Sequence, residues 1–303
     1  SCNFAIARDG IGRFRCSAFW QRDQAGMVVR RIVTQIPKAE DLGLPDVLKD
    51  VIMSKRGLVL FVGGTGTGKS TSLAALIGHR NQSSHGHILT IEDPIEFVHE
   101  HANCVVTQRE VGIDTQSFDD ALKSSLRQAP DVILIGEIRS METMEYAMSF
   151  ADTGHLCVAT LHANNANQAI ERIMHLAPPE QHAKLRYDLS LNMRAIIAQQ
   201  LVPTADGNGR VAAIEILLNS PLVQDMVQRG EVSGLKEAMK KGKEMGMQSF
   251  DMALYELFKA GRITMDQALH HSDSPNDLRL MIKLESDSGT SLGSLSDVTI
   301  DMD

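Results

Sequence analysis

The sequence lacks three features that would place it in other classes of protein. Its four cysteines are scattered and form no C-x-x-C pair, so nothing supports a zinc site. No apolar run approaches the roughly 20 residues that a membrane-spanning helix needs. Positive charge is also in short supply, because 30 Lys and Arg against 38 Asp and Glu leave a net charge of -8. That balance disfavours nucleic acid as the main partner.

Length and the start of the chain set further expectations. Its 303 residues, 43% of them hydrophobic, suffice for one large domain and a smaller one. No signal-peptide pattern is visible, and the chain opens at Ser1 rather than at a methionine. We therefore expect a cytoplasmic protein with reduced cysteines, whose amino-terminal part is missing or trimmed.

One short stretch carries the strongest chemical signal. Residues 58–62 form an apolar run typical of a buried parallel strand, and a helix is predicted from Lys69 to about His79. Between them the sequence satisfies the phosphate-loop spacing G-x-x-x-x-G-K-[ST]. The residues predicted to bind a nucleotide are Gly63, Gly64, Thr65, Gly66, Thr67, Gly68, Lys69, Ser70 and Thr71.

This spacing has a mechanical meaning. Glycines let the backbone curl so that N–H groups point at phosphate oxygens, and the following helix adds the positive end of its dipole. Lys69 can neutralise phosphate charge, and the Ser70 hydroxyl can ligate Mg²⁺. The alternative is a chance glycine-rich turn, which a complete pattern between a strand and a helix disfavours.

The order of the elements predicts an α/β fold. Apolar runs alternate with helical stretches, which is typical of a mainly parallel sheet with helices on its faces. The chain after Ser220 is predicted to be helical, and residues 285–303, an acidic tail without Lys or Arg, to be disordered. The strands expected in this sheet are 58–62, 88–91, 132–135 and 156–161, with a hairpin at 196–202 and 210–218.

Residues 1–36 are predicted to contain strands only. Turn signals at Asp9-Gly10 and Ala25-Gly26 separate three alternating stretches. Three strands without a covering helix make a poor independent domain, so we interpret them as the end of a small α+β domain. Residues 37–56 are then a linker with a connecting helix. The expected strands are 3–7, 12–20 and 27–36, and the helix is 46–55.

Two acids and a histidine follow the predicted strands. Glu96, Glu137 and His162 each lie shortly after the end of one strand. Because the carboxyl ends of parallel strands meet at one edge of a sheet, we expect these side chains near the phosphate loop. Glu96 and Glu137 can orient a water molecule or hold the Mg²⁺ hydration shell, and His162 can sense the phosphate state. As an alternative, either glutamate is a helix N-cap or a structural ion-pair partner of Arg139.

The sequence allows more than one role for several arginines, and it departs from the usual metal-binding pattern at Gly136. Gly136 stands where phosphate-loop enzymes commonly carry an aspartate for Mg²⁺, so the metal is expected to depend more on Ser70, phosphates and water. Arg109 and Arg127 can each reach the γ-phosphate in a neighbouring subunit, or form a surface or interface salt bridge. Arg13 and Arg15 share one strand face, where they would contact nucleotide or solvent.

Taken together, four boxes resemble the secretion-superfamily ATPases, and specifically the PilT/PilU family of type IV pilus retraction motors. They are G-G-T-G-T-G-K-S, I-L-T-I-E-D-P-I-E-F-V-H, D-V-I-L-I-G-E-I-R and T-G-H-L-C-V-A-T-L-H-A-N. The resemblance runs from about Gly10 to Leu284. It implies a RecA-like P-loop NTPase motor domain over residues 57–284 and a partial PAS-like domain over residues 1–36.

The resemblance also implies partners and residue roles. It implies a homo-hexamer with Mg²⁺ and ATP at the subunit interfaces, bound peripherally at the inner membrane through a pilus platform protein. Glu96 resembles the general base, Glu137 the Walker B glutamate that serves the metal, and His162 the residue at the γ-phosphate. Arg109 and Arg127 resemble the arginines that reach into a neighbour's site.

Departures point to one branch of the family. Where PilT-like motors carry A-I-R-N-L-I, this sequence has P-L-V-Q-D-M-V, and its tail is acidic. Both features are more similar to PilU, the accessory paralogue of a PilT-like motor. A pilus assembly or type II secretion ATPase remains an alternative, although such proteins often carry two C-x-x-C pairs. A ring subunit that mainly couples to a partner motor, with little turnover of its own, remains another.

Overall fold

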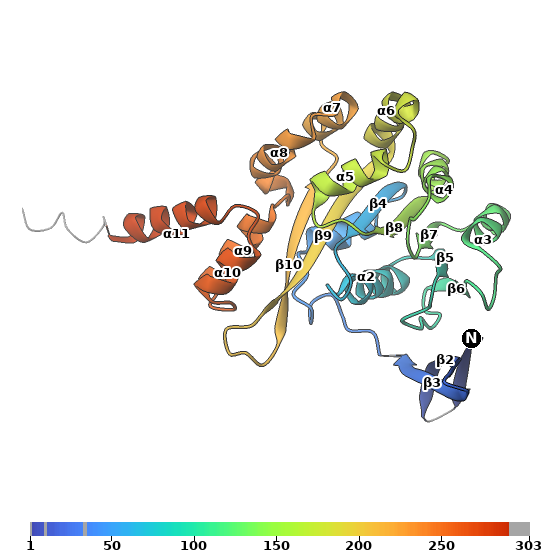
Figure 1. Ribbon diagram of the computed structural model, residues 1–303. Coiled ribbons are helices and arrows are strands. Elements are labelled where there is room, and N and C mark those ends of the chain that lie inside the picture. Colours follow the sequence, from blue (N-terminus) through green and yellow to red (C-terminus); the bar gives the residue numbers. More distant parts are fainter. Residues whose placement is uncertain (1, 9–10, 33–34, 291–303) are drawn as a thin grey trace, which may run out of the picture.

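A seven-stranded sheet forms the centre of the molecule in the computed structural model, which describes residues 2–8, 11–32 and 35–290 (Figure 1). The strand order is β10-β9-β4-β8-β7-β5-β6, and every neighbouring pair is parallel except the hairpin of β9 and β10. The predicted α/β fold with a mainly parallel sheet is therefore confirmed, as is the hairpin. The strands are β4 Gly57–Val62, β5 Gly86–Glu92, β6 Cys104–Glu110, β7 Val132–Ile135, β8 Leu156–Leu161, β9 Met193–Pro203 and β10 Arg210–Leu218.

Helices cover both faces of this sheet. Alternate residues of β4 point to opposite faces: Leu60 belongs to an apolar cluster that includes residues of α3 to α11, whereas Phe61 belongs to one that includes residues of α1 and α2. A strand buried on both faces reads as one continuous apolar run, which is why residues 58–62 were recognisable. The helices are α1 Val47–Ile52, α2 Lys69–Ser83, α3 Phe118–Ser125, α4 Met141–Asp152, α5 Ala166–Met174, α6 His182–Asn192, α7 Pro221–Arg229, α8 Leu235–Lys241, α9 Phe250–Lys259, α10 Met265–His271 and α11 Pro275–Thr290. Among the described residues, none of these helices combines the length and apolar character needed to cross a bilayer.

Strand β6 was not predicted from the sequence. It forms the edge of the sheet next to β5, and four of its seven residues are partly or fully exposed, so it contains no long apolar run. An edge strand needs only one neighbour and one buried face, which leaves polar residues such as Gln108 and Arg109 within it.

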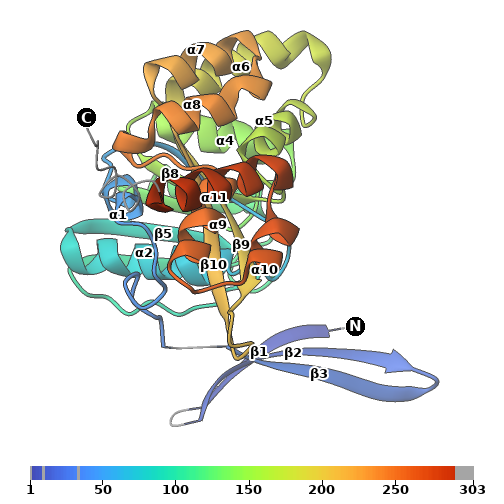
Figure 2. The same cartoon turned by 90° about the vertical axis from the view of Figure 1, so that its left-hand side faces the viewer.

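The amino-terminal strands form a separate antiparallel sheet in the order β1-β2-β3 (Figure 2). The predicted turn at Ala25-Gly26 is wrong, because the chain turns at Arg22 and Asp23, whose φ angles are +48° and +59°. Gly26 instead lies within β3, where a Cβ atom would come within 2.8 Å of the Phe19 ring. The predicted turn at Asp9-Gly10 lies outside the described residues. The three strands are β1 Cys2–Arg8, β2 Gly12–Gln21 and β3 Gln24–Ile32.

Three predicted boundaries need correction. The third amino-terminal strand is described to Ile32 and does not include residues 35 and 36, and the connecting helix is confined to α1. Helix α11 is described through Thr290 and so reaches into the predicted tail, whose residues 291–303 lie outside the described part. Burial of Leu278 fixes the start of α11, and a helix once begun extends at low cost through residues of weak propensity.

Glu215 on β10 is a fully buried carboxylate. Its Oε1 atom accepts a hydrogen bond from the Ala166 amide at 2.7 Å, at the start of α5. Its Oε2 atom has no hydrogen-bond partner among the described residues. Burial raises the pKa of Glu215 from 4.5 to about 7, so in the folded protein this side chain is mostly neutral below about pH 7.

This raised pKa predicts a pH-dependent loss of stability. The contribution of the neutral Glu215 side chain to the free energy of unfolding is fully present below pH 4.5. It is lost as the pH rises through about 7. Relative to a Glu215→Gln variant, wild type should be about equally stable at pH 4.5 and less stable at pH 8, by on the order of 3 kcal/mol. Urea unfolding at both pH values measures the difference, with the exposed Glu231→Gln variant as the control for lost charge. An equal difference at the two pH values would contradict this account.

Candidate functional site

The phosphate-loop sequence forms a tight turn between β4 and α2. Gly63, Gly66 and Gly68 have φ angles of +154°, +79° and +84°, which L side chains rarely adopt. A Cβ atom on Gly63 would lie 2.6 Å from both the Gln199 carbonyl oxygen and Thr67 Oγ1. The turn therefore requires glycine on steric grounds, and it ends where Lys69 begins α2.

Lys69 lies between the loop and the acidic residues. Its Nζ atom donates to the carbonyl oxygens of Gly63 and Gly64 at 2.8 and 2.7 Å. Burial lowers the pKa of Lys69, and the charges of Glu137 and Glu96 oppose that shift. The ammonium group and both carboxylates thus act on one another within one site.

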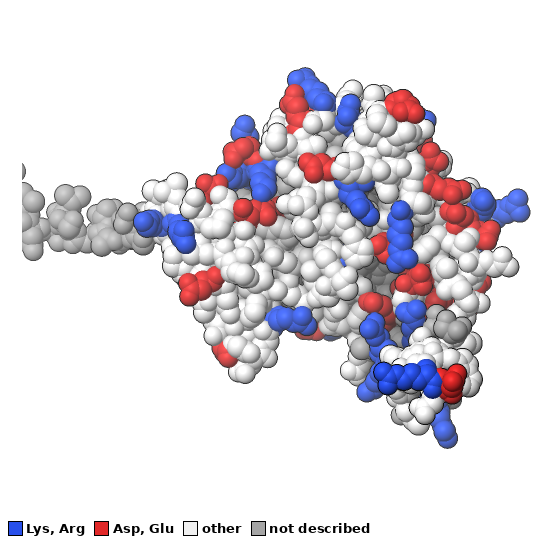
Figure 3. Space-filling model, in the orientation of Figure 1, with Lys and Arg blue, Asp and Glu red and all other residues white. Residues whose placement is uncertain are grey.

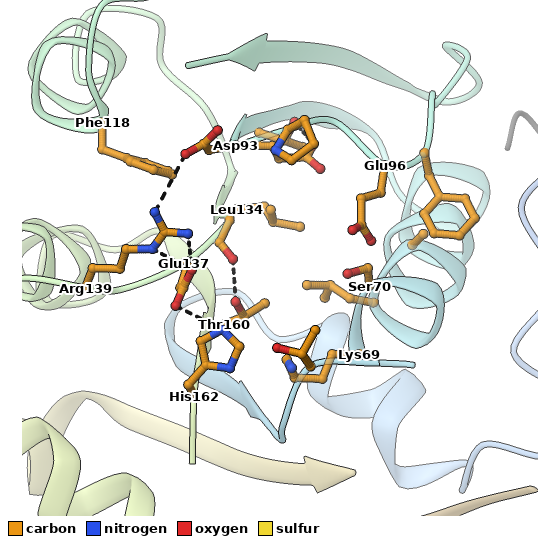
Figure 4. A pocket seen from close by; sticks show the side chains of 18 of the residues that line it. Lys69, Ser70, Asp93, Glu96, Phe118, Leu134, Glu137, Arg139, Thr160 and His162 are labelled. Atoms are coloured by element: carbon orange, nitrogen blue, oxygen red, sulfur yellow. Dashed lines mark hydrogen bonds and ion pairs between the residues drawn. The ribbon is translucent and has the colours of Figure 1, made fainter. Parts of the chain in front are cut away.

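The ends of four adjacent strands bring the predicted residues together. Lys69 and Ser70 follow β4, and Glu96, Glu137 and His162 follow β5, β7 and β8 respectively. All five line one pocket, and their side chains surround a common space (Figure 4). The sheet edge thereby places positive charge, hydroxyl, carboxylates and imidazole around a volume suited to a nucleotide's phosphates.

Glu137 is the centre of a polar network in this pocket. Its Oε1 atom lies 3.2 Å from His162 Nε2, and its Oε2 atom lies 2.7 Å from Arg139 Nε and Nη2 (Figure 4). Arg139 also approaches Asp93, at 3.7 Å. The ion pair with Arg139, which the sequence offered as an alternative, is therefore present. A carboxylate has about four lone-pair positions, so Glu137 retains the capacity to accept a bond from water.

Glu92 is the last residue of β5, the strand that Glu96 follows, but it was not singled out from the sequence. Its Oε1 atom accepts from Thr90 Oγ1 at 2.6 Å and from Gln108 Nε2 at 3.2 Å. Burial raises the pKa of Glu92. The signal that could have found it is its place at the strand end, one residue before the D-P-I-E of the acidic box.

Aromatic and imidazole groups also line the pocket. Phe97, His99 and Phe118 line it, and burial lowers the pKa of His99 to about 4, so this ring is neutral at pH 7. Gln108 fixes the same loop, because it donates to the Phe97 carbonyl at 2.9 Å and accepts from the His99 amide at 2.7 Å. Neither contact follows from local sequence patterns.

Gly136 explains why an aspartate is absent after β7. A Cβ atom there would lie 3.1 Å from both the Glu92 Cα atom and the Ile91 carbonyl oxygen. These are backbone atoms of the neighbouring strand β5, which has little freedom to yield. The close approach of the two strand ends therefore disfavours a side chain at this position.

A Gly136→Ala variant should accordingly be less stable than wild type, by about 1–3 kcal/mol, as is typical of overpacking. The Gly78→Ala variant is the matched control, because its new Cβ atom would meet only Ile36 at an ordinary 3.9 Å. Urea unfolding measures both. A Gly136→Ala variant as stable as Gly78→Ala would show that β5 and β7 separate easily.

The two candidate arginines do not lie in this pocket. Arg109 donates to Ser124 Oγ at 2.8 Å and to the Asp114 carbonyl oxygen at 3.3 Å. Arg127 is exposed and has no ion-pair partner among the residues that the structure describes. Their role in a neighbouring subunit's site stays a prediction.

The amino-terminal arginines lie beside a different hollow. Arginine side chains gather on the amino-terminal sheet (Figure 3), and Arg15, Arg30 and Arg31 line a small hollow together with Glu96 and Phe97. The side chain of Arg13 is outside the described part.

The pocket fits magnesium in the mode that this ion prefers. Among the described residues, no group of three or more His, Cys, Asp or Glu side chains is placed to hold a metal ion. Mg²⁺ usually keeps several waters and takes one or two protein ligands together with substrate phosphates. The Ser70 hydroxyl and the carboxylates opposite it supply that kind of donor set.

Comparison with known proteins gives consistent matches over most of the chain. The family model described as "Type II/IV secretion system protein" matches residues 14–278. The chain is 64% identical over 287 residues to the Type IV pilus ATPase PilU of Pseudomonas aeruginosa, covering 95% of this chain and 75% of that protein. It is 42% identical over 275 residues to the Type IV pilus retractation ATPase PilT of the same organism, covering 91% and 80%.

Solved structures agree with the sequence matches. The pilus retraction motor PilT with bound ADP is similar with a TM-score of 0.85 and 41% identity, covering 92% of this chain and 80% of that one. The Legionella pneumophila ATPase DotB is similar with a TM-score of 0.75 and 28% identity, covering 93% and 77%. The predicted RecA-like P-loop motor fold is thereby confirmed.

Proposed function

The chain belongs to the Type II/IV secretion system protein family, and we propose that it acts as the accessory, PilU-like ATPase of a type IV pilus retraction machine. That it is a pilus retraction ATPase of the secretion superfamily follows from its relatives. The accessory role, the metal, the residue roles and the partners are the proposal. The single observation that supports the mechanism is the contact between Glu137 and His162 in the pocket of Lys69 and Ser70.

The chain's own residues divide the reaction between them. The loop amides and Lys69 hold the phosphates, and the Ser70 hydroxyl would hold Mg²⁺ together with water around Glu137. When bound, Mg²⁺ would neutralise charge on the β- and γ-phosphate oxygens. Glu96 acts as the base that orients the attacking water, and Glu137 fixes His162 by their 3.2 Å contact. His162 then registers whether a γ-phosphate is present.

Assembly would complete the site. We propose a ring of six in which Arg109 and Arg127 reach a neighbour's phosphates, which agrees with their absence from their own subunit's pocket. Residues 57–284 are the motor domain, residues 1–36 the end of a PAS-like domain, and residues 37–56 the linker between them. In this proposal the ring lies in the cytoplasm at the inner membrane, bound to a platform protein and to a PilT-like paralogue.

Phosphate release by the full chain, measured alone and mixed with a PilT-like paralogue, tests this function. We expect turnover by the chain alone and a changed rate in the mixture. No turnover by the chain alone, together with a changed rate in the mixture, would favour the alternative of a coupling subunit. Turnover that the paralogue leaves unchanged would contradict the accessory role.

A further inference from the structure

Two consecutive glutamines on β9 contact different parts of the molecule. Gln199 and Gln200, here called the glutamine pair, lie beyond the point where β9 pairs with the end of β4. Successive strand residues point to opposite faces of a sheet. Gln199 therefore faces the side covered by α2, and Gln200 faces the side covered by the carboxyl-terminal helices, where α9 and α10 lie over β9 and β10 (Figure 2).

The buried side chain of Gln199 forms a hydrogen bond with the backbone of the phosphate loop. It is 3% exposed, and its Nε2 atom donates to the Thr67 carbonyl oxygen at 2.9 Å. The same residue crowds two loop glycines, since Cβ atoms on Gly63 and Gly68 would lie 2.6 and 2.8 Å from its atoms. Its Oε1 atom is buried without a hydrogen-bond partner among the described residues. An unpaired buried acceptor lowers the stability of the ligand-free protein. We therefore interpret Gln199 as serving the function of the loop rather than the stability of the fold.

Gln200 holds the end of α10. Its Nε2 atom donates to the His271 carbonyl oxygen at 3.0 Å, and its Oε1 atom lies 3.4 Å from His271 Nδ1. His271 is the last residue of α10, just before the turn into α11. Adjacent residues of one strand thus join the nucleotide loop to the carboxyl-terminal helices, with no flexible segment between them.

We propose that Gln199 is a positioning residue for the phosphate loop, and that the glutamine pair transmits occupancy of this loop to α10. A loop that adjusts around phosphate shifts Thr67 and offers its amides to the unpaired Oε1 atom of Gln199. The same strand segment carries that shift to His271 through Gln200. The inference rests on the proposed function, because it requires a nucleotide at this loop.

Methionine variants of the full chain test both parts, because methionine keeps the volume of glutamine and lacks its donor and acceptor. For Gln199→Met we expect about tenfold weaker binding of a fluorescent ADP analogue, as for one lost buried hydrogen bond. Its urea unfolding midpoint should not fall, since the variant also removes an unpaired acceptor. The control is Gln228→Met, at an exposed position on α7. A midpoint that falls together with affinity, or unchanged affinity, would overturn the positioning role.

Hydrogen–deuterium exchange over residues 265–271, with and without ADP, tests the transmission. In wild type and Gln228→Met, ADP should change exchange in α10, and in Gln200→Met the change should disappear. The same response in Gln200→Met as in wild type, or no response in wild type, would overturn it. The Lys69→Ala variant separates this inference from the proposed function. If Lys69→Ala still binds ADP, the proposed function itself is rejected. If Lys69→Ala loses ADP binding and Gln199→Met keeps it, only the inference is rejected.

Discussion

A Glu137→Gln variant is expected to lose at least about 100-fold in kcat for ATP hydrolysis, the scale of a lost general base or electrostatic partner. Glutamine keeps the shape of the side chain but not its charge, which interacts with Arg139, His162 and Lys69. Binding should survive, because the loop amides and Lys69 remain. Steady-state phosphate release gives kcat, and titration with a fluorescent ATP analogue gives affinity.

The control for this variant is Glu142→Gln, an exposed glutamate in the first turn of α4. It removes one negative charge from the same region without touching the pocket, and its kcat should match that of wild type. A Glu137→Gln variant that hydrolyses ATP within about threefold of this control would contradict the catalytic role. A change that small is less than the loss of one typical hydrogen bond produces.

The second large effect is expected on binding. A Lys69→Ala variant should bind ATP and ADP at least about 100-fold more weakly, because charge-assisted contacts to phosphate are among the strongest hydrogen bonds in proteins. In the present structure the ammonium group already contacts the Gly63 and Gly64 carbonyls, so it lies inside the loop. Isothermal titration calorimetry measures the loss.

Two further variants sharpen this test. Lys55→Ala removes an exposed lysine outside the pocket and should bind nucleotide as wild type does. Lys69→Arg keeps the charge, but a planar guanidinium cannot replace the compact ammonium between two loop carbonyls, so binding should remain weak. Nucleotide affinity restored by arginine would mean that bulk charge at this position is enough.

The parts of the fold that sequence predicted are those governed by local rules. Strands β4, β7 and β8 are buried on both faces, so each reads as an apolar run. The glycine spacing marks a turn that only glycine can form, and the rule for the edge of a parallel sheet placed Glu137 and His162 beside Lys69.

The parts that sequence missed depend on neighbours distant in the chain. The edge strand β6 is polar because only one of its sides pairs. The crowding at Gly136 comes from backbone atoms of β5, and Glu92 accepts a hydrogen bond from Gln108 on the neighbouring strand β6. The contact of Gln199 with Thr67 joins residues 132 positions apart. Distances of this kind are set by packing, which a local pattern does not encode.

The most direct test of the account is a structure of the full chain with Mg²⁺ and a non-hydrolysable ATP analogue. We predict that the γ-phosphate lies between Lys69 Nζ and the Glu137–His162 pair, with Ser70 Oγ on the metal and Glu96 facing the attacking water. A nucleotide bound in this pocket with neither Glu137 nor His162 near its γ-phosphate, or a nucleotide bound elsewhere on the chain, would contradict it.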